Sequence, residues 1–330
     1  MDPLTYADAG VNIERAESFV TRLKKQANRP GHKQMWNAAG GYASIYPLAG
    51  DTAVAVTTDG VGTKLLVAEE LEEHGTIGID LVAMVANDLI CVGATPTMFL
   101  DYFAVGTLQD KLADAIISGI IEGCDQAGMI LAGGETAEMP GVYEPGKYDL
   151  AGFAVGNVTK KTLITGDRIA PGQKVIGVAS SGIHSNGLSL ARKVLKGNRA
   201  AMSKLLKPTL IYVKPVVELF NSLPSSITGM AHITGGGWRN MFRLSDKVGF
   251  QIDSPLPIPD ILAEIGKFVK PDEMYRTFNM GMGLVIIAET HAEKIVETFT
   301  LAGFNAQVVG VVTDKAKTLT VPSLKLTIHD

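Results

Sequence analysis

The order of apolar and polar positions divides the chain into alternating predicted strands and helices. Short, β-branched apolar runs predict strands at 52–58, 98–105, 129–132, 148–158, 174–179, 283–288 and 306–312. Apolar residues at helical spacing predict helices at 12–26, 77–92, 110–126, 188–195, 213–223, 260–267 and 292–301. Because few crossovers between the strands are short, the pattern favours an α+β fold with helices on one face of a sheet.

A turn-rich stretch separates these elements into two groups. The residues Thr165-Gly166-Asp167 form a predicted turn, and Pro171-Gly172 follows before the next strand. A chain of 330 residues is long enough for two domains of ordinary size. We therefore expect domains at 1–168 and 169–330.

The helix predicted at 77–92 is apolar nearly all round, so we expect it to be buried. Asp80 and Asp88 are eight residues apart, which puts them near one face of that helix. A buried Asn87-Asp88 pair is costly unless the carboxylate is bound to a cation or paired in a salt bridge. Both alternatives remain open from the sequence.

Composition and charge exclude several classes of protein. Hydrophobic residues make up 46% and charged residues 19%, as in a packed globular protein. A net charge of −4 argues against non-specific binding of nucleic acid. Cys91 and Cys124 lie in apolar stretches, which is typical of buried thiols in a reducing compartment. Without a signal peptide at the start or an uninterrupted apolar span, we expect a cytoplasmic protein without a membrane partner.

One stretch, Asp59-Gly60-Val61-Gly62-Thr63-Lys64, lies between a predicted strand and a predicted helix. Gly60 and Gly62 allow a ligand to approach the backbone, and the N–H groups of a helix start bind phosphate oxygens. Asp59 offers an oxygen ligand for Mg²⁺, and Lys64 offers a positive charge for a polyphosphate. The spacing is neither a Walker A loop nor a Rossmann fingerprint. An ordinary turn with solvated charges is the alternative.

Other polar segments follow strands in the same way. Gly133-Gly134-Glu135 follows a predicted strand, and if Glu135 meets Asp59 and Asp88 the three carboxylates would hold Mg²⁺ against a nucleotide. His184 and, second, His232 are candidates for proton transfer, although a loop histidine often only donates a structural hydrogen bond. The alternative for Gly235-Gly236-Gly237 is a helix start without a ligand.

Taken together and in order, these segments resemble the phosphoribosylformylglycinamidine cyclo-ligase family, also called aminoimidazole ribonucleotide synthetases. The resemblance covers essentially the whole chain. It rests on Asp-Gly-Val-Gly-Thr-Lys at 59–64, Asn-Asp-Leu at 87–89, Gly-Gly-Glu-Thr-Ala-Glu-Met-Pro at 133–140, Ser-Ser-Gly-x-His-Ser-Asn-Gly at 180–187, His-x-Thr-Gly-Gly-Gly at 232–237, and the more family-specific segments at 6–11 and 273–279.

The resemblance implies ATP-dependent closure of formylglycinamidine ribonucleotide to aminoimidazole ribonucleotide, with release of ADP and phosphate, in purine biosynthesis. It implies Mg²⁺, with K⁺ as a further ion, and a homodimer. It also implies two α/β domains, of which the first contributes a sheet to a dimeric β-barrel and the second forms an open sheet with helices.

By position in these motifs, the resemblance assigns site residues. It places metal ligands at Asp59, Asp88 and Glu135, and catalytic groups at His184, Lys64 and Asp59. The residues assigned to ATP or phosphate are Lys24, Gly60, Gly62, Thr63, Lys64, Gly133, Gly134, Gly235, Gly236 and Gly237. The chain departs from the family pattern at 40–43 and at 196–207, so contacts from those segments are not carried over.

Two other functions compete with this interpretation. Selenophosphate synthetase and thiamine-phosphate kinase belong to the same ATP-using superfamily, but the early Cys usual in the former is absent before Cys91. A non-catalytic ATP sensor is the second competitor. A sensor need not retain all of the acidic residues Asp59, Asp88 and Glu135, which favours an enzyme.

Overall fold

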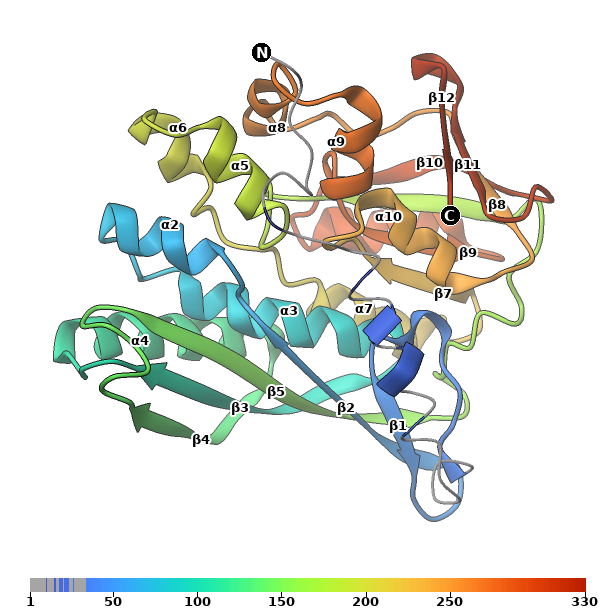
Figure 1. Ribbon diagram of the computed structural model, residues 1–330. Helices are drawn as coiled ribbons and strands as arrows, with labels where there is room; N and C mark the ends of the chain where they lie inside the picture. Colours follow the sequence, from blue (N-terminus) through green and yellow to red (C-terminus); the bar gives the residue numbers. More distant parts are fainter. Residues whose placement is uncertain (1–9, 11–14, 16–17, 20, 24–25, 27–33) are drawn as a thin grey trace.

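The computed structural model describes residues 10, 15, 18, 19, 21–23, 26 and 34–330 (Figure 1). Of the helix predicted at 12–26, residues 15, 18, 19, 21–23 and 26 are described and are helical. Lys24 lies outside the described residues, so its predicted contact with ATP stays a prediction. Within the described part, no helix is long and apolar enough to cross a membrane.

The first sheet has five strands in the order β1-β2-β5-β3-β4. Only β3 and β4 are parallel to each other, while the other neighbours are antiparallel. The strands are β1 (Ser44–Pro47), β2 (Thr52–Gly60), β3 (Thr95–Val105), β4 (Ile130–Glu138) and β5 (Tyr148–Thr159). This sheet is open, with β1 and β4 at its edges, and no closed barrel exists within the described part of the chain.

One prediction is corrected in β4. The segment Gly133-Gly134-Glu135 was expected to form a loop, but it continues the strand and pairs with β3. Gly134 lies opposite Asp101, and a Cβ atom at Gly134 would meet Oδ1 of Asp101 at 2.1 Å. This glycine therefore allows close packing within the sheet.

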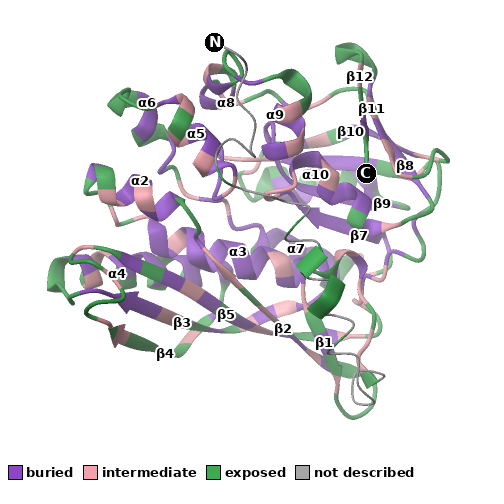
Figure 2. Cartoon of the chain, viewed as in Figure 1, coloured by how far each residue is buried: buried purple, intermediate pink, exposed green. Residues whose placement is uncertain are grey.

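Helices cover one face of the first sheet. They are α3 (Ile77–Cys91) and α4 (Asp110–Ala127), while α2 (Lys64–Leu71) packs against α3. In β5, even-numbered residues are buried beneath the helices and odd-numbered residues face outward. The outer face exposes large apolar side chains from three strands, among them Val56, Met98, Leu100 and Phe153. By contrast, α3 is buried over most of its length (Figure 2).

The second sheet has seven strands in the order β12-β11-β8-β10-β6-β9-β7, antiparallel except for β11 and β8. Its strands are β6 (Lys174–Ala179), β7 (Ile227–His232), β8 (Gly249–Ile252), β9 (Met282–Ala288), β10 (Ala306–Thr313), β11 (Thr318–Val321) and β12 (Leu326–His329). The remaining helices are α5 (Leu188–Val194), α6 (Arg199–Lys204), α7 (Val213–Ser222), α8 (Asp260–Ile265), α9 (Pro271–Thr277) and α10 (Ala292–Leu301), with 3-10 helices η3 (Ala39–Gly41), η4 (Gly237–Leu244) and η5 (Pro322–Leu324). The chain is thus a mixed α+β protein, as predicted.

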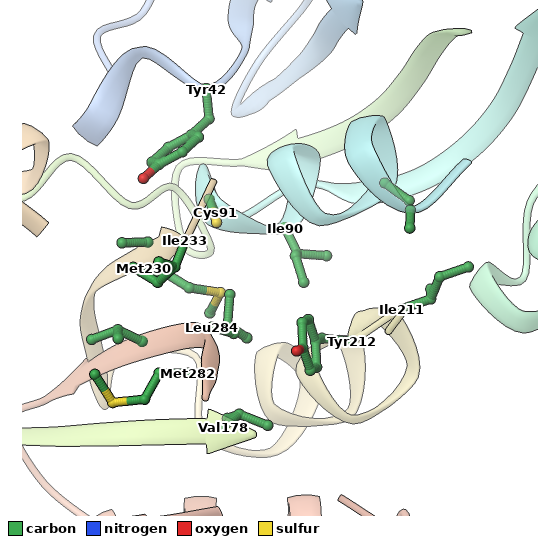
Figure 3. Packing of buried hydrophobic residues seen from close by; sticks show 14 of the residues in the cluster. Tyr42, Ile90, Cys91, Val178, Ile211, Tyr212, Met230, Ile233, Met282 and Leu284 are labelled. Carbon is green, nitrogen blue, oxygen red and sulfur yellow. The ribbon is translucent and has the colours of Figure 1, made fainter. Parts of the chain in front are cut away.

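The helix α3 lies between the two sheets (Figure 1). It packs on β2, β3 and β5 of the first sheet and on β7 of the second. This position explains why the helix is apolar on every side, since almost all of its residues are buried. Side chains from both domains pack together at its C-terminal end, including Ile90, Cys91, Met230 and Leu284 (Figure 3).

Candidate active site

Asp88 and His232 meet where α3 packs on the second sheet. Asp88 lies near the C-terminal end of α3, and His232 is the last residue of β7. Nδ1 of His232 lies 2.9 Å from Oδ1 of Asp88; the imidazole is buried, and the carboxylate is 15% exposed. Because Nδ1 is engaged, Nε2 is the ring nitrogen that remains for proton exchange.

Asp59, near the end of β2, belongs to the same electrostatic cluster. Burial raises the pKa of Asp59 to about 6, and the nearby charge of Asp88 acts in the same direction. The N–H of Gly60 donates a 2.8 Å hydrogen bond to Oδ1 of Asp59 and, with His232, opposes that rise. A buried carboxylate beside a second carboxylate forms a site that a hard cation stabilises.

A cavity of about 630 Å³ opens beside Asp88. Its volume is within the range of small-molecule sites. It is lined by Gly41, Tyr42, Ala43, Ser44, Val56, Thr57, Thr58, Asp88, Phe153, Ala154 and Val155, and of these described residues only Asp88 carries a charge. Tyr42 is held in the wall by the guanidinium of Arg243, which lies 4.3 Å from the centre of its ring.

Glu135 does not join Asp59 and Asp88 within the chain. Across the first sheet, Asp59, Gly152, Asp101 and Gly134 lie opposite one another in one row, so they share a face. Glu135 is the next residue of β4 and therefore faces the opposite, outer side, where it is exposed. Among the described residues, no three His, Cys, Asp or Glu side chains are close enough to hold a metal ion. The predicted convergence of three carboxylates is not found in a single chain.

Lys64 is not presented to a phosphate in this structure. Its side chain is completely buried, and Nζ lies 2.8 Å from Oδ2 of Asp80. The same ammonium donates hydrogen bonds to the backbone oxygens of His184 (3.3 Å) and Lys207 (2.8 Å). Sequence reasoning missed this pairing, although an aspartate in an apolar helix is the signal that a buried cation is needed. The placement does not support the predicted contact between Lys64 and ATP.

His184 is also buried, although it was expected in an open polar loop. Its Nε2 accepts a 3.1 Å hydrogen bond from the N–H of Ser181, and its Nδ1 is buried with no partner in the described structure. Burial lowers the pKa of His184, and the nearby His232 and Lys64 lower it further. The imidazole is therefore neutral at physiological pH, and as placed it does not open to solvent.

Three glycine-containing segments approach one another at the domain boundary. The hydroxyl of Thr63 lies 3.1 Å from that of Ser189 at the start of α5. A Cβ atom at Gly235 would lie 3.2 Å from Oδ1 of Asn186 in the preceding loop. The segment 186–189 therefore lies between the Gly60–Thr63 loop on one side and Gly235 on the other. Gly133 and Gly134 are instead part of β4.

Gly237 has a structural role. It has a φ of +53°, and a Cβ atom there would lie 2.3 Å from the backbone oxygen of Tyr275. The 273–279 segment therefore packs directly against the start of η4, which begins at Gly237. This contact explains one glycine of the triplet without a ligand.

Comparison with known proteins identifies both halves of the chain. Residues 40–158 match the family "AIR synthase related protein, N-terminal domain", and residues 170–321 match its C-terminal domain. Phosphoribosylformylglycinamidine cyclo-ligase of Clostridium tetani is 45% identical over 319 residues, which are 93% of this chain and 96% of that protein.

Solved structures share the fold at low sequence identity. The HypE–HypF complex matches with a TM-score of 0.69 and 18% identity, covering 94% of this chain and 98% of that chain. AaThiL complexed with AMPPCP and TMP matches with a TM-score of 0.66 and 14% identity, covering 96% of both chains. The likeness to the clostridial enzyme extends over almost the whole sequence, and both family domains occur in order. The chain belongs to the phosphoribosylformylglycinamidine cyclo-ligase family of AIR synthase related proteins.

Proposed function

We propose that this protein closes formylglycinamidine ribonucleotide to aminoimidazole ribonucleotide, using one ATP and releasing ADP and phosphate. Family membership over nearly the whole chain supports this reaction. The observation that carries the proposal is the cluster of Asp59, Asp88 and His232, with a ligand-sized cavity beside Asp88. A member of the fold with AMPPCP bound, an ATP analogue, supports ATP as the nucleotide.

The reaction requires that ATP and the substrate are positioned against each other and that a proton is removed from the attacking nitrogen. The formyl oxygen attacks the γ-phosphorus of ATP and ADP leaves, which converts that oxygen into a good leaving group. The amidine nitrogen then attacks the formyl carbon, the C–O bond breaks, and phosphate departs while the nitrogen loses a proton. Nε2 of His232 is the proton acceptor we propose, because Asp88 fixes the ring through Nδ1 and stabilises the imidazolium.

The donor set fits Mg²⁺. Asp59 and Asp88 supply hard oxygen atoms, and the pKa of Asp59 is raised first by burial and then by the charge of Asp88, both of which a bound cation would offset. Mg²⁺ is commonly held by one or two carboxylates together with phosphate oxygens and water, so a third carboxylate is not required. When bound, the ion would neutralise charge on the phosphates. Nothing in the described residues distinguishes a site for K⁺.

The phosphates of ATP are proposed to bind the Gly60–Thr63 loop, where backbone N–H groups precede α2. Gly62 has a φ of +67°, which favours glycine there. Because the side chain of Lys64 is buried against Asp80, we assign the phosphate contact to the backbone of the loop. Gly235 and Gly236 remain candidates for contact with the substrate phosphate.

We also propose that the protein is a homodimer that pairs the outer faces of the first sheets, as in the barrel implied by the family. Val56 (42% exposed) and Phe153 (44% exposed) lie on that face and also line the cavity beside Asp88. A second copy against this face would cover apolar surface and close the cavity. Glu135 lies on the same face, so it would enter the interface.

The proposed reaction is tested by measuring ADP release by the purified protein with ATP and Mg²⁺. Release that requires formylglycinamidine ribonucleotide and matches product one to one supports the cyclo-ligase. Consumption of ATP that instead requires thiamine monophosphate or selenide would assign the chain to another ATP-using activity. Tight ATP binding without release in the presence of any of these substrates would indicate a sensor.

A further inference from the structure

A buried ion pair outside the proposed chemistry joins the two domains. Lys64 and Asp80 belong to the first domain, and neither side chain is exposed to solvent. Nζ lies 2.9 Å from Oδ1 and 2.8 Å from Oδ2 of Asp80, so the ammonium faces both carboxylate oxygens. Removing two charges from water has a free-energy cost that can exceed their attraction, so a buried ion pair is weak evidence of a role in stability. The other contacts of the pair indicate a second role.

The remaining bonds of this pair all reach the second domain. Lys64 donates to the backbone oxygens of His184 and Lys207. Oδ1 of Asp80 accepts from the N–H and the hydroxyl of Thr209, both at 2.7 Å, and from the hydroxyl of Ser185 at 3.1 Å. The pair therefore fixes two second-domain segments, the loop 181–185 and the stretch 207–209.

The two fixed segments also hold each other and His184. The hydroxyl of Ser181 donates a 2.6 Å hydrogen bond to the backbone oxygen of Pro208, and its N–H binds Nε2 of His184. His184 has a φ of +60°, an uncommon backbone conformation for a residue with a side chain. A strained conformation persists only where surrounding contacts determine it, and Lys64 bonds the carbonyl of this very residue.

Asn87, about two turns further along α3 than Asp80, also bonds to the second domain. Its amide nitrogen donates to the backbone oxygen of Leu210 at 2.8 Å, and its amide oxygen accepts from the N–H of Tyr212 at 3.0 Å. Asp80 and Asn87 are seven residues apart, so they project from one face of α3. That face holds the second-domain segment 209–212 by its backbone.

We propose that Lys64 and Asp80 are positioning residues that couple the phosphate loop of the first domain to the His184 loop of the second. Lys64 directly follows the Gly60–Thr63 loop and begins α2, so its backbone lies beside the proposed phosphate-binding loop. Its ammonium group donates a hydrogen bond to the backbone oxygen of His184. This inference rests on the proposed function in assigning phosphates to that loop. In this proposal Lys64 does not contact ATP but acts indirectly, by positioning the His184 loop.

The test compares Lys64→Met with Lys294→Met, which removes a lysine from an exposed pair on α10. We expect Lys64→Met to raise amide hydrogen exchange in 180–187 and 207–212 by about tenfold or more. We expect kcat to fall by about a hundredfold while the Kd for ATP changes by less than about threefold. Lys294→Met should match the wild type in amide exchange, in kcat and in the Kd for ATP. A Kd raised more than about tenfold with unchanged exchange would show that Lys64 contacts ATP instead.

Two milder variants keep the inference testable if Lys64→Met does not fold. Ser185→Ala and Thr209→Val each remove one hydroxyl that donates to Asp80 and leave the ion pair intact. Each should raise exchange in 180–187 by at least about threefold, and unchanged exchange in both would overturn the coupling. Because exchange needs no substrate, it tests the pair even if the wild type fails to close formylglycinamidine ribonucleotide, which would refute only the proposed function.

Discussion

Oδ1 of Asp88 and Nδ1 of His232 lie 2.9 Å apart, although the two residues come from different domains. The helix that carries Asp88 packs on both sheets, and the strand that ends at His232 belongs to the second sheet. A shift between the domains therefore changes this bond directly. In the proposed reaction, proton transfer at His232 would therefore depend on how one domain is placed against the other.

Asp88→Asn should abolish most activity. The amide has no charge with which to hold a cation or to stabilise a protonated His232, so we expect kcat to fall by about 10²–10⁴. The measurement is ADP release at saturating ATP and substrate. Asp51→Asn is the matched control, because Asp51 forms an exposed pair with Lys160 on the surface. Normal turnover by Asp88→Asn would remove Asp88 from the site.

The raised pKa of Asp59 predicts a pH-dependent stability. Because the folded value of about 6 lies above the usual 3.8, the native state holds this proton more tightly than the unfolded chain. This contribution to stability is complete below the usual value and is lost as the pH rises through about 6. Asparagine carries no ionisable group, so Asp59→Asn does not lose this contribution as the pH rises. Above pH 7 the variant should be more stable to unfolding than the wild type by roughly 2–3 kcal/mol.

Thermal unfolding of both proteins between pH 4 and 8 checks this expectation. The difference in Tm should grow from about pH 4 to pH 6 and then level off. Curves that run parallel over the whole range would show that Asp59 ionises normally. Asp51→Asn again serves as the control, since this exposed carboxylate should give no pH-dependent difference.

Mg²⁺ should stabilise the wild type more than Asp59→Asn at pH 8. Binding to the folded state alone raises Tm by mass action, and the ion would compensate the repulsion between Asp59 and Asp88. We expect a rise of a few degrees at about 10 mM MgCl₂ for the wild type and less than half of it for the variant. An equal rise in both proteins would assign the effect to another site or to general salt.

Much of the fold followed from local pattern. The helix expected at 77–92 is found at Ile77–Cys91, because an apolar surface on every side requires burial wherever the helix lies. The short strands β1, β7, β8, β11 and β12 were not predicted. They are four to six residues long, and β7 is buried at every position, so no alternation marks it. Such strands are determined by partners distant in sequence.

The site was predicted less completely, for reasons of register and pairing. Asp88 was predicted as a site residue because a carboxylate inside an apolar helix is costly without a partner, and Asp59 because it offers an oxygen ligand at a glycine turn between a strand and a helix. Glu135 does not meet Asp59 and Asp88 within one chain, because a single step along β4 decides which face a side chain occupies. The pairing of Lys64 with Asp80 was not predicted, because Asp80 lies in the next helix and the sequence does not show which cation meets it.

Gly78→Ala should destabilise the protein, because α3 and α4 approach closely at this residue. A Cβ atom there would lie 2.2 Å from the backbone nitrogen of Ile120. Backbone atoms cannot move aside as a side chain can, so we expect a loss of about 1–3 kcal/mol in denaturant unfolding. Gly75→Ala is the matched control, since a Cβ atom at Gly75 would meet nothing within 4 Å. Equal stability of the two variants would contradict the close packing.

Phe153→Asp should convert the proposed dimer into a monomer. Phe153 lies on the outer face of β5, where Thr58 and Leu100 are its neighbours on the adjacent strands. A charge at the centre of a buried apolar interface costs several kcal/mol per copy, and a twofold interface incurs it twice. Mass measurement by light scattering across about 1–50 μM reports the change. Leu301→Asp, at an apolar residue on α10 that is 78% exposed, should leave the mass unaltered. A monomeric wild type, or a dimeric Phe153→Asp, would exclude this face as the interface.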